Sequence, residues 1–478
     1  MTTRRRWGVS FALLLGLTGL WLLATPPLAG PDEPSHLIRA ASVVRGTLIG
    51  RSTATASTTE VVLPAPFADV GHDPRCFAFH PQVPASCTAA LERHRGVPRR
   101  VLTSAGRYPP AYYVLVGLPS LVWQGIDADL PMRAVSVVLC CALLATAVTW
   151  ATERSGPMAL GVAVSVTPMV LFLGVLVNPN GAEVAAALGA WVGLTRLVLG
   201  RVSRSFLVVL GIVLAALLVA RPISVLFAGL IALLVGALGT PSRWRQLARR
   251  RGVRWVGLAV AGVALLQVGW LLVAQARAVQ VSRHGASWAT AFGKVFAPGH
   301  VGSLAQELVG VFGWKDTPAP VLTQVVWVVA VVALVALALR FGTRRSRLVV
   351  IATLLLCVVV PGVAEALAYP RLGFWWQGRY TLPLAVGLPV VATAALQTPG
   401  PWLRRTCWVL GPLLALAQVA AFVKTLSRYT VGLGHGLGLR SVSWHPPLPP
   451  LVLIGLFVPL SLAWAAWLLT PLARHPAN

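Results

Sequence analysis

Charge is what this sequence has least of, and negative charge above all. Charged residues make up 11% of its 478 residues, with 13 acidic residues against 40 Lys and Arg. Soluble domains carry roughly 25% charged residues, so a soluble globular protein is excluded. The basic residues are scattered between apolar stretches, whereas a nucleic-acid-binding protein gathers them on one soluble face. We therefore expect no nucleic-acid partner.

Long apolar runs take up most of the chain instead. Each is about 20 residues long, enough for a helix to cross the roughly 30 Å hydrocarbon core of a bilayer. The sequence therefore predicts an all-α, polytopic membrane protein with about twelve transmembrane helices. The predicted spans are residues 7–29, 131–152, 157–177, 182–200, 205–220, 222–240, 255–274, 321–340, 348–369, 381–397, 405–426 and 449–472.

Arginine clusters in the short loops predict the orientation. Such clusters favour the cytoplasmic side of a membrane. With twelve spans all of them fall on one side, so we expect both termini to be cytoplasmic. The clusters are Arg4 to Arg6, Arg154, Arg201 with Arg204, six arginines in 243–254, four in 340–347, Arg404 with Arg405, and Arg474.

Two segments leave an alternative open. Residues 109–125 could form a thirteenth span, but this would turn every later basic cluster outward, so we predict an interfacial or re-entrant helix. The first span has the basic start and apolar middle of a signal peptide. Pro27 or Leu22 would occupy the position three before a cut, which disfavours cleavage, and we predict an uncleaved anchor.

This topology gives one membrane domain, residues 1–478, with two long external loops at 30–130 and 275–320. In the first loop, residues 35–50 carry apolar side chains on one face and predict a juxtamembrane amphipathic helix. Residues 51–60 are rich in Ser, Thr and Ala and predict a mobile loop.

Cysteine is rare as well, with six in the chain. Four lie in predicted spans, where cysteine behaves as a small apolar residue. Cys76 and Cys87 lie in the first external loop, and in an oxidising compartment this pair predicts a disulfide. The alternatives are two free thiols or a metal site, and no second ligand pair has the spacing of a zinc site.

The candidate catalytic residues are Asp32 and Glu33, which follow the first span directly. Two adjacent carboxylates beside lipid are costly, and the sequence shows no obvious structural partner for them. Ionisable residues are nearly absent within the spans, where a pump or channel would place them. Glu365, near the outer end of the ninth span, either pairs with Arg371 or Arg379 or contacts a substrate.

Six polar motifs follow one another along the predicted external side. They are Pro31-Asp32-Glu33 with His36, Tyr108-Pro109-Pro110 with Tyr112, Asn178-Pro179, Arg221-Pro222, Phe312-Gly313-Trp314, and Gln377-Gly378-Arg379-Tyr380 with Pro383. This order resembles a bacterial multi-pass family known as domain of unknown function 2142. The resemblance runs from about residue 10 to 470, and the segment from Gln377 to Tyr380 is its most specific part.

That family in turn is similar to the C-type glycosyltransferases, which take a sugar from a polyprenyl-phosphate carrier at the outer membrane face. The resemblance implies an acidic catalytic residue just after the first span, and Asp32 or Glu33 matches it. Relatives often carry Asp where this chain has Asn180, so Glu183 would have to take over any role in metal binding. No cofactor is certain, and a divalent cation such as Mg²⁺ or Mn²⁺ is a possible requirement.

The chemistry fits these residue types. In an inverting transfer an acceptor hydroxyl attacks the anomeric carbon while the lipid phosphate leaves, and a carboxylate can take the hydroxyl proton. We assign Asp32 as this base, with Glu33 as its alternate or as an orienting group. Arg379 and Arg221 would hold the phosphate, since a guanidinium binds it through two hydrogen bonds. The alternative for Arg379 is a side chain that snorkels to the interface.

Further residues are candidates for contact with the substrate. Trp375 and Trp376 would line a sugar or lipid groove with Tyr380, or they belong to an ordinary aromatic belt. The full set of predicted substrate-binding residues is His36, Arg39, Tyr108, Asn178, Asn180, Glu183, Arg221, Trp314, Lys315, Asp316, Gln377, Arg379 and Tyr380.

The function expected from the sequence is therefore a glycosyltransferase of the bacterial cytoplasmic membrane, active on the extracytoplasmic side. Its partners would be membrane lipid, a polyprenyl-phosphate-linked sugar, and a glycan or lipid acceptor of the cell envelope. Two alternatives remain open: a flippase or transporter of lipid-linked saccharides, and a non-catalytic scaffold for envelope assembly. A transporter predicts polar residues through the bundle midplane and an internal repeat, neither of which the sequence shows.

Overall fold

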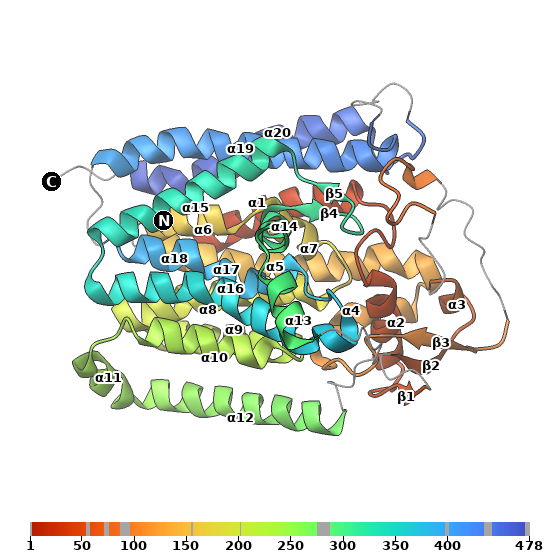
Figure 1. The fold of residues 1–478 in the computed structure, drawn as a ribbon, viewed down its shortest axis with the longest axis horizontal. Coiled ribbons are helices and arrows are strands. Elements are labelled where there is room, and N and C mark those ends of the chain that lie inside the picture. Colours follow the sequence, from red (N-terminus) through yellow and green to blue (C-terminus); the bar gives the residue numbers. More distant parts are fainter. Residues whose placement is uncertain are drawn as a thin grey trace.

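A computed structural model of the chain shows helices that run side by side, with both termini at one end of the bundle and the short strands toward the other (Figure 1). The two termini share an end, as an even number of spans requires. The residues that the structure describes are 2–53, 58–70, 76–86, 96–153, 156–200, 202–274, 287–396, 401–434 and 442–473.

Eight helices of the described residues are long and apolar enough to cross a membrane. They coincide with eight of the predicted spans, which confirms a polytopic, all-helical membrane protein. Among them α1 packs on α5, α5 on α8, and α19 on α20. Their bounds are α1 (Thr3–Leu23), α5 (Asp129–Thr152), α8 (Pro179–Leu199), α12 (Arg251–Val273), α15 (Val321–Phe341), α16 (Arg344–Leu372), α19 (Pro401–Thr430) and α20 (Pro450–Ala473).

The other four predicted spans are also helical, but they are short or interrupted. Thr167 begins a new helix by accepting a hydrogen bond from the Val170 N–H, which splits the third span. Arg221 is extended because the residue before a proline avoids the helical region, so one helix ends there and another follows. These helices are α6 (Met158–Ser165), α7 (Pro168–Gly174), α9 (Arg204–Ala220), α10 (Ser224–Gly236), α17 (Gly378–Ala385) and α18 (Gly387–Ala394).

The junction between α17 and α18 is held by a tryptophan of α8. The Trp191 indole N–H donates to the carbonyl of Pro383 at 2.9 Å. A side chain at Gly387 would meet the Trp191 ring at 1.9 Å, so this position requires glycine. The tryptophan thereby satisfies a backbone carbonyl next to the junction, which water cannot do inside a membrane protein.

The predicted first external loop folds into a cap on one end of the bundle (Figure 1). The amphipathic helix predicted for residues 35–50 ends earlier, at Val43. It is buried on nearly all sides because α4 and other elements of the cap cover it. The ends of the predicted mobile loop form antiparallel strands, with Arg51 opposite Glu60. The elements of the cap are α2 (Glu33–Val43), β1 (Arg51–Ser52), β2 (Thr59–Leu63), α3 (Phe67–Val70), β3 (Arg99–Thr103), α4 (Ala111–Gly117), η2 (Leu118–Leu121) and η3 (Gly125–Ala128).

The sheet of this cap, in the order β1-β2-β3, has no counterpart in the sequence prediction. The ambiguous segment 109–125 forms α4, η2 and the start of η3. Its apolar helix extends only over Ala111–Leu121, too short to cross a membrane, as the prediction of an interfacial helix requires.

The second long loop supplies a smaller layer beside the cap. α14 packs on α17 and α13 on α16, so this loop contacts two late helices. The elements are α13 (Trp288–Val295), α14 (Pro298–Val309) and the strand pair β4 (Val311–Phe312) and β5 (Thr317–Pro318). At the opposite end, α11 (Pro241–Ala248) carries part of the largest arginine cluster.

The structure agrees in part with the prediction of one disulfide and four cysteines within spans. Cys76 is disulfide-bonded. Its expected partner, Cys87, lies outside the described residues. The four cysteines of the predicted spans are free thiols, namely Cys140, Cys141, Cys357 and Cys407.

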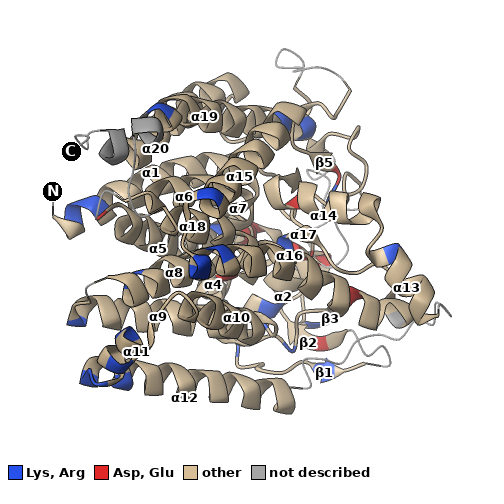
Figure 2. Cartoon of the chain, turned by 60° about the vertical axis from the view of Figure 1, so that its left-hand side comes forward, with Lys and Arg blue, Asp and Glu red and all other residues tan. Residues whose placement is uncertain are grey.

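Basic and acidic residues are distributed unequally along the bundle. Figure 2 shows blue segments at the N-terminal end of α1 and over α11, whereas red segments lie mainly near β2, β5, α14 and α17. The arginine distribution predicts that the first of these ends is cytoplasmic.

This orientation can be tested with two exposed serines. In intact cells, we expect Ser104→Cys beside β3 to react with a membrane-impermeant maleimide, and Ser242→Cys in α11 to react only after permeabilisation. Both positions are exposed, so accessibility to the reagent is limited by the membrane alone. The reverse labelling pattern would contradict the predicted orientation.

Candidate functional site

The two adjacent carboxylates Asp32 and Glu33 occupy different environments. The Asp32 backbone adopts a left-handed conformation, with φ 63°, which is uncommon for a residue with a side chain. Its side chain remains 46% accessible, whereas that of Glu33 is fully buried. Only Asp32 can therefore reach a bound molecule.

Glu33 is a structural anchor. Its carboxylate accepts two hydrogen bonds from Arg133 of α5, at 2.7 and 2.5 Å. It also accepts the backbone N–H groups of Gly30 at 3.0 Å and Val177 at 2.8 Å. Arg133 forms a further ion pair with Asp129. With its oxygens committed to these donors, Glu33 is not available as the alternate base.

Arg379, near the start of α17, holds the Asp32 segment from the other side. One terminal nitrogen donates to Asp32 Oδ2, and the other donates to the carbonyl of Pro31 at 3.2 Å. The side chain is almost completely buried, so it does not snorkel to the surface. Its Nε–H has no partner among the described residues, which leaves one donor free within the site.

The guanidinium groups of Arg221 and Arg379 both lie against the ring of Tyr380. The centre of the Arg221 guanidinium is 4.5 Å from the Tyr380 ring centroid, and that of Arg379 is 5.1 Å from it. Arg221 pairs with Glu183 of α8 at 3.1 Å, and Glu183 also accepts from Ser224 at 2.6 Å. The Arg221 Nε–H likewise lacks a partner within the described part of the chain. Two positive charges thus face one ring, each balanced by one carboxylate.

The asparagines of the Asn178-Pro179-Asn180 motif connect these groups. Asn178 caps α8 by accepting from the Asn180 N–H, and it donates to the Pro31 carbonyl at 3.3 Å. Asn180 donates to Glu183 at 3.2 Å and to the carbonyl of Arg379 at 3.3 Å. The motif therefore positions both ion pairs.

Histidine and tyrosine side chains complete the cluster. His36 Nδ1 is 2.7 Å from the Tyr113 hydroxyl, and the Tyr108 ring packs edge-on against the His36 ring. Burial lowers the pKa of His36 to about 3, with Asp32 opposing and Arg221 adding to the effect. Burial by itself would raise the pKa of Asp32, but the charge of Arg379 holds it below its usual value. At neutral pH the site thus contains a neutral imidazole and an ionised Asp32.

Other predicted substrate-binding residues are engaged in structural contacts. Arg39 donates to three backbone carbonyls, those of Thr47, Leu48 and Tyr108, at 2.7 to 3.2 Å. It therefore closes the cap, because buried carbonyls need donors.

The Phe312-Gly313-Trp314 motif and its neighbours join the second loop to the bundle. Trp314 donates to the Leu28 carbonyl at 3.1 Å, and Asp316 pairs with Arg428 at 2.9 Å. Lys315 pairs with Glu307 of α14 at 2.9 Å. None of the interactions that the described residues show brings these three side chains into contact with Asp32.

The segment before α17 is held by two carboxylates, Glu307, which the sequence did not place in the site, and Glu365, for which it left an ion pair or a substrate contact open. Glu307 accepts the Gly378 N–H at 2.6 Å. Glu365 pairs with His300 at 2.6 Å and accepts the N–H groups of Trp375 and Trp376, both at 3.0 Å. Of the two arginines expected as partners of Glu365, Arg379 binds Asp32 instead, and the side chain of Arg371 lies outside the described residues.

Trp375 and Trp376 differ in burial, since Trp375 is half-buried and Trp376 is buried. The Trp376 indole is buried and donates to Thr381 at 2.9 Å, so it is part of the protein interior rather than an aromatic belt. The Gln377 Oε1 atom is buried without a partner in the described chain. The sequence did not indicate that Glu307 and Glu365 contact the chain around the Gln377–Tyr380 segment, because these contacts form only in the folded protein.

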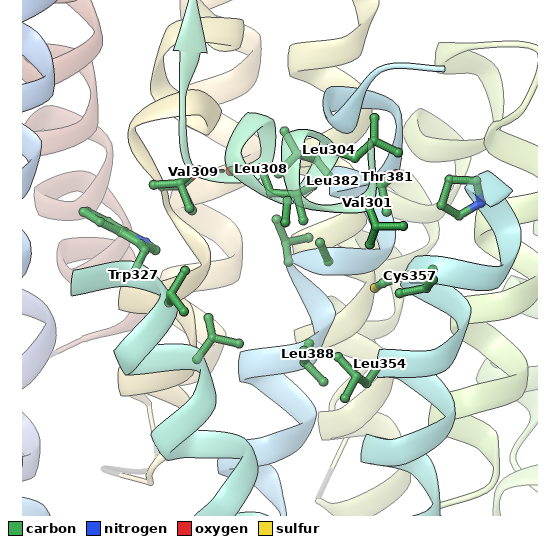
Figure 3. A pocket seen from close by; sticks show the side chains of 18 of the residues that line it. Val301, Leu304, Leu308, Val309, Trp327, Leu354, Cys357, Thr381, Leu382 and Leu388 are labelled. Carbon is green, nitrogen blue, oxygen red and sulfur yellow. Dashed lines mark hydrogen bonds between the residues drawn. The ribbon is translucent and has the colours of Figure 1, made fainter. Parts of the chain in front are cut away.

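An apolar cavity lies on the other side of α17. It has a volume of about 270 Å³ and lies between α14, α15, α16, α17 and α18. Figure 3 shows Thr381 and Leu382 at its upper end beside Leu304 of α14, with Leu354 and Leu388 farther down. Val328 and Val332 of α15 line the cavity and are exposed on the outer surface of the bundle. The cavity therefore adjoins the bilayer at the α15 face.

The site does not fit a divalent cation. Each carboxylate near Tyr380 is matched by a guanidinium, Asp32 by Arg379 and Glu183 by Arg221. Among the described residues, no group of three or more His, Cys, Asp or Glu side chains could hold a metal ion.

Comparison with known proteins places the chain in a family. Residues 15–388 match the family model described as predicted membrane protein, domain of unknown function 2142. The chain belongs to this family. No curated protein matches it. The arabinosyltransferase EmbB from Mycobacterium smegmatis is a structural neighbour with a TM-score of 0.41 and 14% identity, over 98% of this chain and 42% of that chain. The chain thus spans less than half the length of that enzyme.

The contrast between the two carboxylates of this family member is open to a direct test. We expect Glu33→Gln to destabilise the purified protein by about 3–5 kcal/mol, because it removes a charged partner that buried Arg133 contacts through two hydrogen bonds. Asp32→Asn should lower the free energy of unfolding by less, because the Asp32 side chain is half accessible and solvent screens part of the charge that is left on Arg379. Equal losses for both variants would contradict separate roles.

Proposed function

We propose that this protein is a membrane glycosyltransferase that moves a sugar from a polyprenyl-phosphate carrier to a glycan or lipid acceptor at the outer face of the cytoplasmic membrane. The proposal rests on one observation above all: the accessible carboxylate of Asp32 lies beside two buried guanidiniums that share the Tyr380 ring. A base next to a site for anionic oxygen is what transfer from a sugar phosphate needs.

The reaction would use Asp32 as the base. The acceptor hydroxyl oxygen forms a bond to the anomeric carbon, and its proton passes to the Asp32 carboxylate. The bond between the anomeric carbon and the phosphate oxygen breaks, and its electron pair remains on the phosphate. Arg379 and Arg221 stabilise the charge that develops there, for which a single donor is worth about 3 kcal/mol.

Substrate binding and base activation would be linked through Arg379. Without a ligand, Arg379 donates to Asp32 and lowers the pKa of that carboxyl. A phosphate bound by Arg379 competes for the same terminal nitrogen, so it weakens this hydrogen bond. The pKa of Asp32 then rises towards its ordinary value, and the carboxylate becomes a better proton acceptor when the donor is in place.

The remaining groups have supporting roles in this scheme. Glu183 and Asn180 hold Arg221 and the backbone of Arg379 in position. The neutral side chain of His36, which is hydrogen-bonded to Tyr113, would form an uncharged surface beside the sugar. The lipid chain of the donor would lie in the apolar cavity below α14, where valines of α15 give access from the bilayer.

The central test is transfer of labelled sugar from endogenous lipid carriers in membranes of a deletion strain. At matched protein levels, wild type should restore a labelled glycan, and Asp32→Asn should lower the rate at least about 100-fold through loss of the base. Glu60→Gln, a carboxylate of β2 in the same cap, is the matched control and should leave the rate unchanged.

Full activity of Asp32→Asn would remove Asp32 from the chemistry. If wild type itself changes no glycan, the glycosyltransferase proposal fails and transport of a lipid-linked saccharide becomes the stronger alternative.

The cavity can be tested by ligand chain length. We expect a long-chain polyprenyl phosphate to stabilise the purified protein against heat at concentrations at least about tenfold below those required for geranyl phosphate. Val331→Trp should abolish this difference, since an indole would fill a cavity of about 270 Å³. Val329→Trp, on the exposed face of the same helix and outside the cavity lining, should preserve it. Loss of the preference in both variants, or in neither, would contradict the assignment.

A further inference from the structure

A second cavity lies at the opposite end of the bundle from the residues assigned above (Figure 1). It has a volume of about 810 Å³, within the range of about 300–1,000 Å³ that is usual for ligand sites. Four helices form it: the start of α1, the end of α5, the end of α8 and the start of α9. The residues that line it are Thr3, Arg4, Arg6, Trp150, Glu153, Arg196, Ser203, Ser205, Phe206 and Val209.

The polar part of this cleft is positively charged. Three guanidiniums, those of Arg4, Arg6 and Arg196, face one carboxylate, that of Glu153. Glu153 is committed to Arg196 and accepts a hydrogen bond from Thr3 at 2.8 Å. Arg6 donates to the carbonyl of Thr152. The cleft therefore retains excess positive charge after its internal ion pair is counted.

Donors of a second kind lie at the same place. Ser203 caps α9, so the hydroxyls of Ser203 and Ser205 and the first N–H groups of a 17-residue helix are next to the arginines. The N-terminus of a helix favours negative charge because its first N–H groups lack partners within the helix.

The floor of the cleft is apolar. Trp150 and Phe206 are buried and pack edge to face, with ring centroids 5.1 Å apart. The guanidinium of Arg196 lies 4.9 Å from the Phe206 ring centroid, and Val209 extends the lining to the exposed surface of α9. Arginines that served only to orient the protein in the membrane would need neither a concave surface nor an apolar floor beneath them.

We infer that this cleft binds the phosphate headgroup of an anionic phospholipid of the inner leaflet, with the arginines and serines on the phosphate and the first part of the acyl chains over the apolar floor. The basic end of the bundle is the end predicted to face the cytoplasm, where anionic lipids attract clustered arginines. This site is independent of the proposed transferase reaction, which takes place at the other end.

The experiment is a lipid titration of the purified full-length protein by native mass spectrometry, with phosphatidylglycerol and phosphatidylcholine of the same acyl chains. Wild type should bind phosphatidylglycerol at least about tenfold more tightly. Arg4→Gln should weaken this binding roughly fivefold and Arg4→Gln/Arg196→Gln by more than about tenfold, as expected for two lost arginine contacts.

The control is Arg249→Gln/Arg251→Gln, which removes the same charge from exposed positions of the same end outside the cleft. It should change the affinity by less than about twofold. An equal loss in the control, or equal affinity for the two lipids, would overturn the site. Displacement of the lipid by inorganic phosphate at the same concentration would show a site for free phosphate and would also overturn the proposal. Arg4 is exposed and makes no hydrogen bond within the described chain, so its variant separates binding from folding.

Discussion

The structure depends on a single buried charge, that of Glu33. Removing a carboxylate from water is costly unless ionic and hydrogen-bonding partners replace the solvent. Here the partners come from three places: Arg133 in α5, the Val177 N–H just before α8, and the Gly30 N–H of the same turn. Satisfying Glu33 therefore brings the first external turn, α5 and α8 together, and this arrangement fixes the position of Asp32.

The candidate site follows from that constraint. With the turn at Pro31 held in place, Arg379 and Asn178 both donate to the Pro31 carbonyl, so α17 and α8 meet at the same atom. The two guanidiniums near Tyr380 repel each other, and Asp32 and Glu183 offset this repulsion. Under the proposed function, a bound phosphate would replace part of the contacts that Asp32 and Glu183 make with these guanidiniums.

Hydropathy predicted the helical segments well because a bilayer leaves a chain few alternatives to the helix. It did not predict the break at Thr167, where this residue caps a new helix. It also did not predict the break between α17 and α18, next to which Trp191 of α8 binds the Pro383 carbonyl. The strands β1 to β3 were missed because they are short and because β3 pairs with β2 across a long stretch of chain.

The sequence predicted which residues gather at the candidate site, but not the role of each residue. Asp32, Arg221, Arg379 and Tyr380 were selected in sequence as polar groups of one side, and the structure brings them together. Adjacent residues of a helical turn point in different directions, so sequence could not tell Asp32 from Glu33. Their partners lie at residues 379 and 133, and only the folded chain shows which carboxylate meets which guanidinium.

The left-handed backbone at Asp32 also affects how this position should be probed. Asparagine and aspartate tolerate that conformation better than other residues with a side chain, and glycine adopts it freely. An alanine replacement would therefore combine loss of the carboxylate with a conformational penalty, and an alanine scan would overstate the importance of the functional group. Substitution by asparagine isolates the charge, while substitution by glycine would report the backbone strain that the native turn maintains.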